Sequence, residues 1–136
     1  HAAARAQDVV TAASYAATRA ERVHLVGVGA AGLWTLLARP LVDVSGRCVV
    51  DMAGFDPADD DALIARAYIP GLARAGGALT AGILTAPSPL TLCSVTSDVD
   101  MSPVASAYEA AGAGEAFATS KASASVGLVL RELSRS

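Results

Sequence analysis

The sequence predicts an α/β fold, a three-layer α/β/α arrangement around a mostly parallel sheet. Short apolar runs bounded by turn residues, typical of buried parallel strands, alternate with longer stretches whose apolar residues recur at helical spacing. The first such run, Val23–Val26, passes through a glycine turn directly into a helical pattern. The residues are 53% hydrophobic but only 4% aromatic, so we expect an aliphatic core.

The first half of the chain supplies two strands and their helices. Residues 5–19 form a helical pattern with one apolar face. The strand Val23–Val26 leads through the glycine turn into a second helix, which Pro40 ends because proline cannot continue a helix. The second strand, Arg47–Ala53, has an apolar centre, and the turn residues from Gly54 to Pro57 break it.

The second half continues the alternation, so the predicted order is α-β-α-β-α-β-α-β-α. Asp59–Asp61 precede a short helix, where we interpret them as capping residues and not as a cation site. Broken helical pieces lead to the third strand, Leu90–Thr96. A helix over Ser102–Ala111, an edge strand over Glu115–Thr119 and a last helix over Ser123–Leu133 follow. Right-handed crossovers would place helices on both faces of the sheet.

Composition and length exclude several classes of protein. The net charge of −3 and the absence of a Lys/Arg run argue against nucleic-acid binding. No window holds the roughly 18 to 20 apolar residues that a membrane span needs, so we expect a soluble protein of undetermined compartment. The 136 residues are expected to form a single domain, 1–136.

The two cysteines and the first residue of the chain each support a further prediction. Cys48 and Cys93 both fall inside predicted strands, so we expect buried free thiols and neither a disulfide nor a metal site. The chain begins at His1, without Met and without a signal segment, which suggests a processed chain or a piece of a longer protein.

The turn from Gly27 to Gly32 is the motif most typical of a binding or catalytic site. Gly27, Gly29 and Gly32 have the G-x-G-x-x-G spacing, after a strand and before a helix. Asp51, at the end of the next strand, lies where a ribose-binding carboxylate would be expected, which suggests a Rossmann-type domain that binds NAD. The helix before the first strand argues against it. Another interpretation needs no ligand: the glycines only let helix and strand pack closely.

Short motifs spread over nearly the whole chain carry a resemblance to a known family. They are Val23–Trp34, Asp60–Asp61, Tyr68–Gly77, Ala86–Leu90 and Ala107–Gly112. Together they resemble the C-terminal half of an α/β-hydrolase, and are most similar to large bacterial proteins related to acetyl xylan esterases and dienelactone hydrolases. The resemblance implies that the chain has the fold of the C-terminal half of an α/β-hydrolase-like protein. It would then contain only part of the full sheet.

The resemblance also implies where a catalytic triad would lie. The turn would read Gly-x-Ser-x-Gly, but Gly29 stands at the serine position and Ala31 at the next glycine position. The acid would be Asp98 or Asp100, after the third strand. The base would be a histidine near Lys121, and the sequence has none there. Because a serine mechanism needs nucleophile and base together, the triad is degenerate.

We therefore expect a non-catalytic α/β-hydrolase-like domain with a structural, oligomerisation or ligand-binding role in an esterase or glycan-processing protein, without cofactor or metal. Two alternatives stay open. One is an active carboxylic-ester hydrolase whose nucleophile and base lie outside this chain, and the other is the Rossmann-type domain. In a full α/β-hydrolase sheet the strand Val23–Val26 would be flanked on both sides, so the resemblance implies that a partner covers its edge here, either a missing N-terminal half or a second copy. No nucleic-acid or membrane partner is expected.

Overall fold

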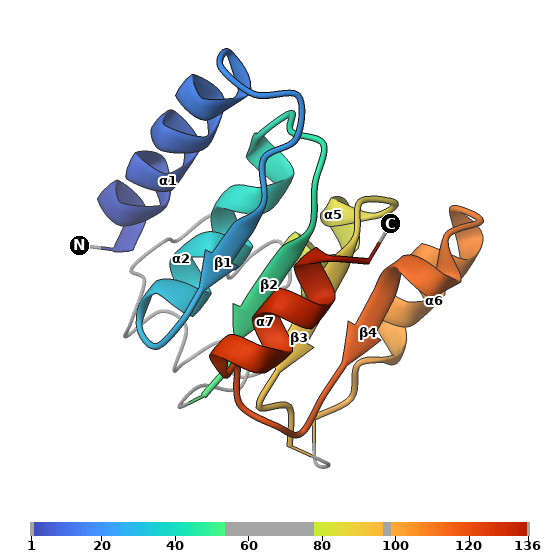
Figure 1. Cartoon of the computed structure of the whole chain (residues 1–136). Helices are drawn as coiled ribbons and strands as arrows, with labels where there is room; N and C mark the ends of the chain where they lie inside the picture. Colours follow the sequence, from blue (N-terminus) through green and yellow to red (C-terminus); the bar gives the residue numbers. More distant parts are fainter. Residues whose placement is uncertain (1, 54–77, 97–98, 136) are drawn as a thin grey trace.

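The computed structural model describes residues 2–53, 78–96 and 99–135 (Figure 1). Its centre is a four-stranded sheet in the order β1-β2-β3-β4, and every neighbouring pair is parallel. The strands are β1 (Leu25–Gly27), β2 (Cys48–Asp51), β3 (Leu90–Cys93) and β4 (Phe117–Thr119). The predicted α/β class with a parallel sheet is confirmed.

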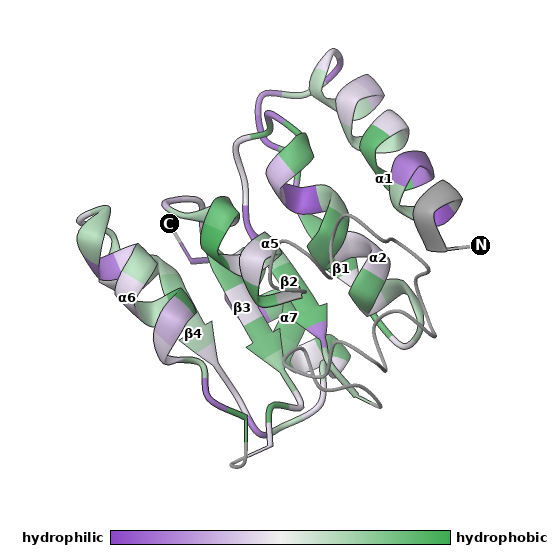
Figure 2. Ribbon diagram, turned by 180° about the vertical axis from the view of Figure 1, so that it is seen from behind, coloured by the Kyte–Doolittle hydropathy of each residue, from purple (hydrophilic) through white to green (hydrophobic). Residues whose placement is uncertain are grey.

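Helices cover both faces of this sheet. They are α1 (Ala2–Ala17), α2 (Ala31–Ala38), α5 (Ala78–Thr85), α6 (Ser102–Ala110) and α7 (Val126–Leu133). α1, α2, α5 and α6 lie on one face, and α7 lies alone among the described helices on the other (Figures 1 and 2). Because the strands follow one another in sequence order, right-handed crossovers bring their connecting helices to the same face.

The face under the four helices holds the larger core. Leu36 of α2, Val50 of β2 and Leu92 of β3 are buried together there, and Figure 2 shows the apolar colouring of these elements where they meet. Tyr108 of α6 is fully buried, stacks on Phe117 with ring centroids 5.3 Å apart, and donates its hydroxyl to the Ser88 carbonyl. Its ring therefore anchors α6 to the sheet while its polar end is satisfied.

The face under α7 holds a smaller core. Val49, Cys93 and Leu128 are buried there against one another. Ser125 caps α7, since its hydroxyl accepts the backbone N–H of Leu128 at 3.2 Å. Cys48, on the other face, and Cys93 are both free and fully buried, as predicted, and burial raises the pKa of the Cys48 thiol to about 12.

Element boundaries differ from the prediction for local reasons. The strands are shorter than expected; β3 ends at Cys93 because Ser94 takes a left-handed backbone conformation with φ 58°, which extended strands do not contain. α2 ends at Ala38, and Pro40 lies inside a short 3₁₀ turn, η1 (Arg39–Leu41). The fourth strand is preceded by another such turn, η2 (Gly114–Ala116).

The helices show no membrane-spanning element in the part of the chain described. The longest, α1, has 16 residues, fewer than the roughly 20 that cross a bilayer.

Candidate functional site

The turn between β1 and α2 lies at the carboxyl edge of the sheet, where α/β proteins commonly place ligands. Gly29 is exposed at its tip and has φ +63°, in the left-handed region that glycine adopts without steric cost. A Cβ at Gly29 would have no neighbour within 4 Å among the described residues. This glycine is therefore required by backbone conformation and not by crowding.

The other two glycines of the motif are required by close packing. A Cβ on Gly27 would lie 2.5 Å from the Thr35 hydroxyl oxygen and 2.7 Å from the Ala31 carbonyl. A Cβ on Gly32 would overlap the backbone carbonyl oxygen of Asp51 at the end of β2. These contacts account for both glycines without a ligand, since any larger residue would push α2 away from the strands.

The backbone N–H groups of the turn are partly used within it. Ala31 donates to the carbonyl of Val28 at 3.3 Å, and Gly32 donates to that of Gly29 at 3.1 Å. A phosphate cradle depends on such N–H groups pointing at the ligand. Two of the candidate donors in this turn are thus already bonded.

Asp51 holds three segments together at the same edge. Its side chain is buried and accepts the backbone N–H groups of Ala53 at 2.9 Å and Ala124 at 3.4 Å, and it also binds Ser94. Burial raises the pKa of Asp51, but the hydrogen bonds from Ala53, Ser94 and Ala124 outweigh burial and lower the pKa below its usual range. The carboxylate ties the end of β2 to β3 and to the loop before α7.

The partners of Asp51 could not be read from the sequence. Ala124 lies 73 residues away along the chain and contributes only a backbone N–H group, so no side-chain pattern marks it. Ser94 has the required hydroxyl, but its contact with Asp51 depends on the pairing of β2 with β3.

The implied triad positions are only partly described. Asp100 is exposed and lies just before α6: its carboxylate accepts the Ser102 N–H at 2.9 Å, and hydrogen bonds from the Ser102 hydroxyl and backbone lower its pKa. Asp98 lies outside the described residues. Lys121 is exposed in the loop after β4, whose neighbouring residue Ala122 accepts a hydrogen bond from the Ser94 N–H.

His24 lies at the opposite edge of the sheet from Gly29. It precedes β1, whereas Gly29 follows it, and its Nδ1 accepts the backbone N–H of Arg47 at 2.8 Å. The structure therefore does not bring this histidine to the turn. His1 lies outside the described residues.

The free edge of β1 borders an apolar groove. Within the described residues β1 pairs only with β2, and Val26 is 40% exposed. A cavity of about 340 Å³ lies between β1 and α1, lined by Val9 and Ala13 of the helix and by Leu25 and Val26 of the strand. The sequence predicted the free edge, but the groove depends on where α1 packs.

Carboxylates and thiols do not gather into a metal site in the segments described: no group of three or more His, Cys, Asp or Glu side chains could hold an ion there. Asp59–Asp61 and the helix predicted after them lie outside the described residues.

Comparisons of the chain with protein-family profiles, curated proteins and solved structures found no match.

Proposed function

We propose that this chain is a non-catalytic domain of the α/β-hydrolase type, with a structural, oligomerisation or ligand-binding role in an esterase or glycan-processing protein. The observation that carries the proposal is the turn between β1 and α2. Gly29 stands at its exposed tip with φ +63°, in the place where the resemblance puts a catalytic serine. The backbone has an elbow, but its residue has no side chain to form an acyl intermediate.

The surroundings of the turn support a non-catalytic role. A serine nucleophile needs an imidazole or another base within hydrogen-bond reach. His24 lies at the other edge of the sheet, and Lys121 stands in the loop where the histidine would be expected. Ser94 is engaged with the Asp51 carboxylate, and no imidazole in the described residues could activate it.

Hydrolysis of p-nitrophenyl acetate tests this proposal. We expect the wild-type chain to hydrolyse the ester no faster than the buffer does, because nucleophile and base are both missing. The variant Gly29→Ser should stay equally inactive, because a serine without a base is a poor nucleophile. Initial rates followed by nitrophenolate absorbance give the comparison.

Gly112→Ser is the matched control for this substitution. Gly112 also has a left-handed backbone, φ +73°, and a Cβ there would have no neighbour within 4 Å. The two variants therefore carry similar backbone strain, of about 1–3 kcal/mol. Turnover by the wild-type chain would contradict the non-catalytic assignment. Turnover by Gly29→Ser but not by Gly112→Ser would show that a base is present after all.

The Rossmann-type hypothesis has less support. It needs Asp51 free to accept ribose hydroxyls, whereas this carboxylate is buried and bonded to Ala53, Ser94 and Ala124. The packing of Gly27 and Gly32 also needs no dinucleotide.

We infer that the free edge of β1 is covered in the functional assembly by a missing N-terminal half or by a second copy. An unpaired edge strand offers a row of free backbone donors and acceptors, and such edges readily pair with another strand. Here the edge lies beside the apolar groove of α1, so a fifth strand or a partner surface would also bury Val9 and Val26.

The isolated chain is accordingly expected to self-associate. Val26→Lys should reduce the association, because a lysine in the groove beside the edge opposes strand pairing. Val126→Lys is the matched control, since Val126 is 76% exposed on α7, on the other face. Sedimentation velocity measures the association. A clean monomer whose β1 amides exchange rapidly with solvent would contradict this inference.

A further inference from the structure

A second cavity lies at the amino edge of the sheet, away from the glycine turn. Its volume is about 170 Å³, and its lining is basic: Arg22 and His24 precede β1, Arg47 precedes β2, and Arg135 follows α7. Parallel strands place all their amino ends at one edge, so the sheet gathers Arg22, His24 and Arg47 there. Arg135 joins them through the hydrogen bond from the Arg47 side chain to its carbonyl. Three arginines around one small cavity are notable in a chain with net charge −3.

Arg47 is held in place from two sides. Its backbone N–H donates to His24 Nδ1 at 2.8 Å, and its side-chain Nε donates to the Arg135 carbonyl at 2.9 Å. The terminal guanidinium nitrogens carry no hydrogen bond to the described residues. A guanidinium fixed before the ligand arrives loses little conformational entropy on binding, which favours affinity.

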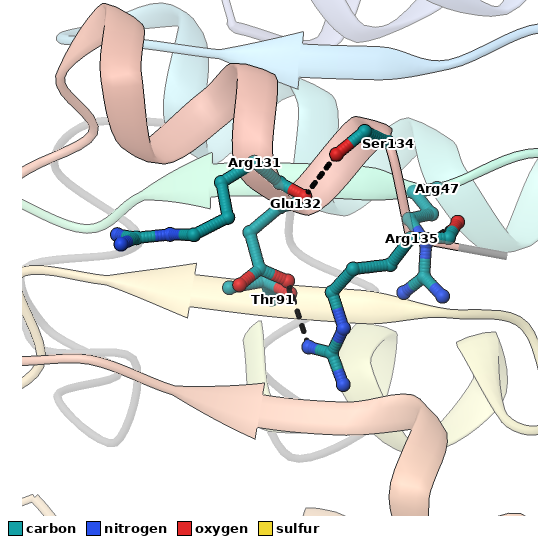
Figure 3. Close-up of polar contacts among 6 residues, drawn as sticks. All are labelled: Arg47, Thr91, Arg131, Glu132, Ser134 and Arg135. Atoms are coloured by element: carbon teal, nitrogen blue, oxygen red, sulfur yellow. Dashed lines mark hydrogen bonds and ion pairs between the residues drawn. The ribbon is translucent and has the colours of Figure 1, made fainter.

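The neighbouring groups leave the cavity positively charged. The Glu132 carboxylate binds the Arg135 guanidinium at 3.1 Å and accepts the Thr91 hydroxyl at 3.2 Å (Figure 3). It therefore offsets Arg135. Arg22 and Arg47 form no ion pair with any residue that the structure describes, so their charges are not compensated there.

His24 adds a donor to this set. Because its Nδ1 accepts the Arg47 N–H, the neutral ring carries its proton on Nε2. The residues that line the cavity thus include guanidinium and imidazole side chains. Such donors match oxyanions, and guanidinium binds phosphate and carboxylate oxygens in a bidentate manner.

We propose that this cavity binds a phosphate group, either as inorganic phosphate or as the phosphoryl end of a small monoester. Its volume is below the about 300–1,000 Å³ typical of sites that enclose drug-sized ligands, so a small anionic group fits it best. Two uncompensated arginines match the double negative charge of phosphate more closely than the single charge of a carboxylate. The site is independent of the hydrolase-type proposal, because it lies at the other edge of the sheet.

Calorimetric titration with inorganic phosphate, at constant ionic strength set by sodium chloride, tests the site. We expect saturable binding to the wild-type chain, weakened about tenfold or more in Arg47→Ala and in Arg22→Ala, since each loses hydrogen bonds to a charged group. Arg22 makes no hydrogen bond to the described residues, so Arg22→Ala tests binding even if loss of the Arg47 contacts impairs folding.

Arg131→Ala is the matched control. The substitution removes the same charge as Arg47→Ala, but Arg131 lies on α7 and its side chain points away from Arg47 and Arg135 (Figure 3). The Arg131→Ala variant should bind phosphate with the same affinity as the wild type. Equal weakening in Arg131→Ala, or no saturable binding by the wild type, would overturn the proposal.

Two further titrations identify the kind of anion. Tighter binding of glycerol phosphate than of inorganic phosphate would support a monoester ligand, and equal or weaker binding would support free phosphate. Acetate binding more tightly than either would overturn the assignment to a phosphate group.

Discussion

Gly32→Ala is expected to destabilise the fold by about 2–4 kcal/mol, because overpacking at a site that cannot relax forces backbone shifts. The added methyl group would overlap the carbonyl oxygen of Asp51, which is backbone and cannot rotate away. α2 would have to move away from the end of β2, which would disturb the packing of Leu33 and Leu36 in the core. Urea denaturation followed by circular dichroism measures the loss as a lower transition midpoint.

Gly127→Ala is the matched control for Gly32→Ala. Gly127 lies in α7, and a Cβ there would have no neighbour within 4 Å. Alanine favours helix over glycine, so this variant should be neutral or more stable by up to about 1 kcal/mol. Equal effects of the two substitutions would show that α2 does not approach β2 as closely as described.

Asp51→Asn is expected to destabilise the fold by about 2 kcal/mol at neutral pH. The amide keeps one oxygen but cannot accept hydrogen bonds at both positions, and hydrogen bonds to a charged group contribute about 1.5–3 kcal/mol. Because the folded state lowers the pKa of Asp51 below 3.8, the ionised carboxylate stabilises the fold above that pH. This stability is lost as the pH falls through the lowered pKa. The difference in the free energy of unfolding between wild type and variant should therefore become smaller below about pH 4.

Asp43→Asn is the control for the change in charge. Asp43 is exposed, and its side chain forms no hydrogen bond or ion pair with the described residues. Its substitution should leave the transition midpoint nearly unchanged. A similar loss of stability in both variants would mean that net charge, and not the bonds of Asp51, sets the effect.

The same Asp51→Asn variant separates a structural role from dinucleotide binding. If Asp51 only ties β2 to the loop before α7, the variant loses stability in the absence of NAD. Adding NAD then changes the fluorescence of neither the wild type nor the variant. Trp34, on α2, reports on the turn through its fluorescence. A fluorescence change on adding NAD that disappears in Asp51→Asn would restore the Rossmann-type hypothesis.

The succession of elements could be predicted from the sequence because it depends on local patterns. Apolar runs such as that of β2 and the periodicity of α6 are contained in short windows, and the structure has both elements close to the expected places. The ends of the strands were less predictable. β3 stops at Cys93 because Ser94, the next residue, has a left-handed backbone conformation. No local preference of serine predicts that conformation.

The site could be predicted only where it is continuous in sequence. The position of Gly29 between strand and helix follows from one contiguous motif. The bonds of Asp51 and the cavity of Arg22, Arg47 and Arg135 join segments far apart in the chain. Such sites arise from the pairing order of the strands, which a single sequence does not give.

The strand order also shapes how the chain can reach its native state. Among the strands that the structure describes, none inserts between two earlier ones, so β2, β3 and β4 each add to an edge that already exists. A chain emerging from the ribosome could therefore build the sheet progressively, with little rearrangement and few long-range searches. Among the described helices, α7 packs on Val49 of β2 and Cys93 of β3, so its docking requires that these two strands have already paired.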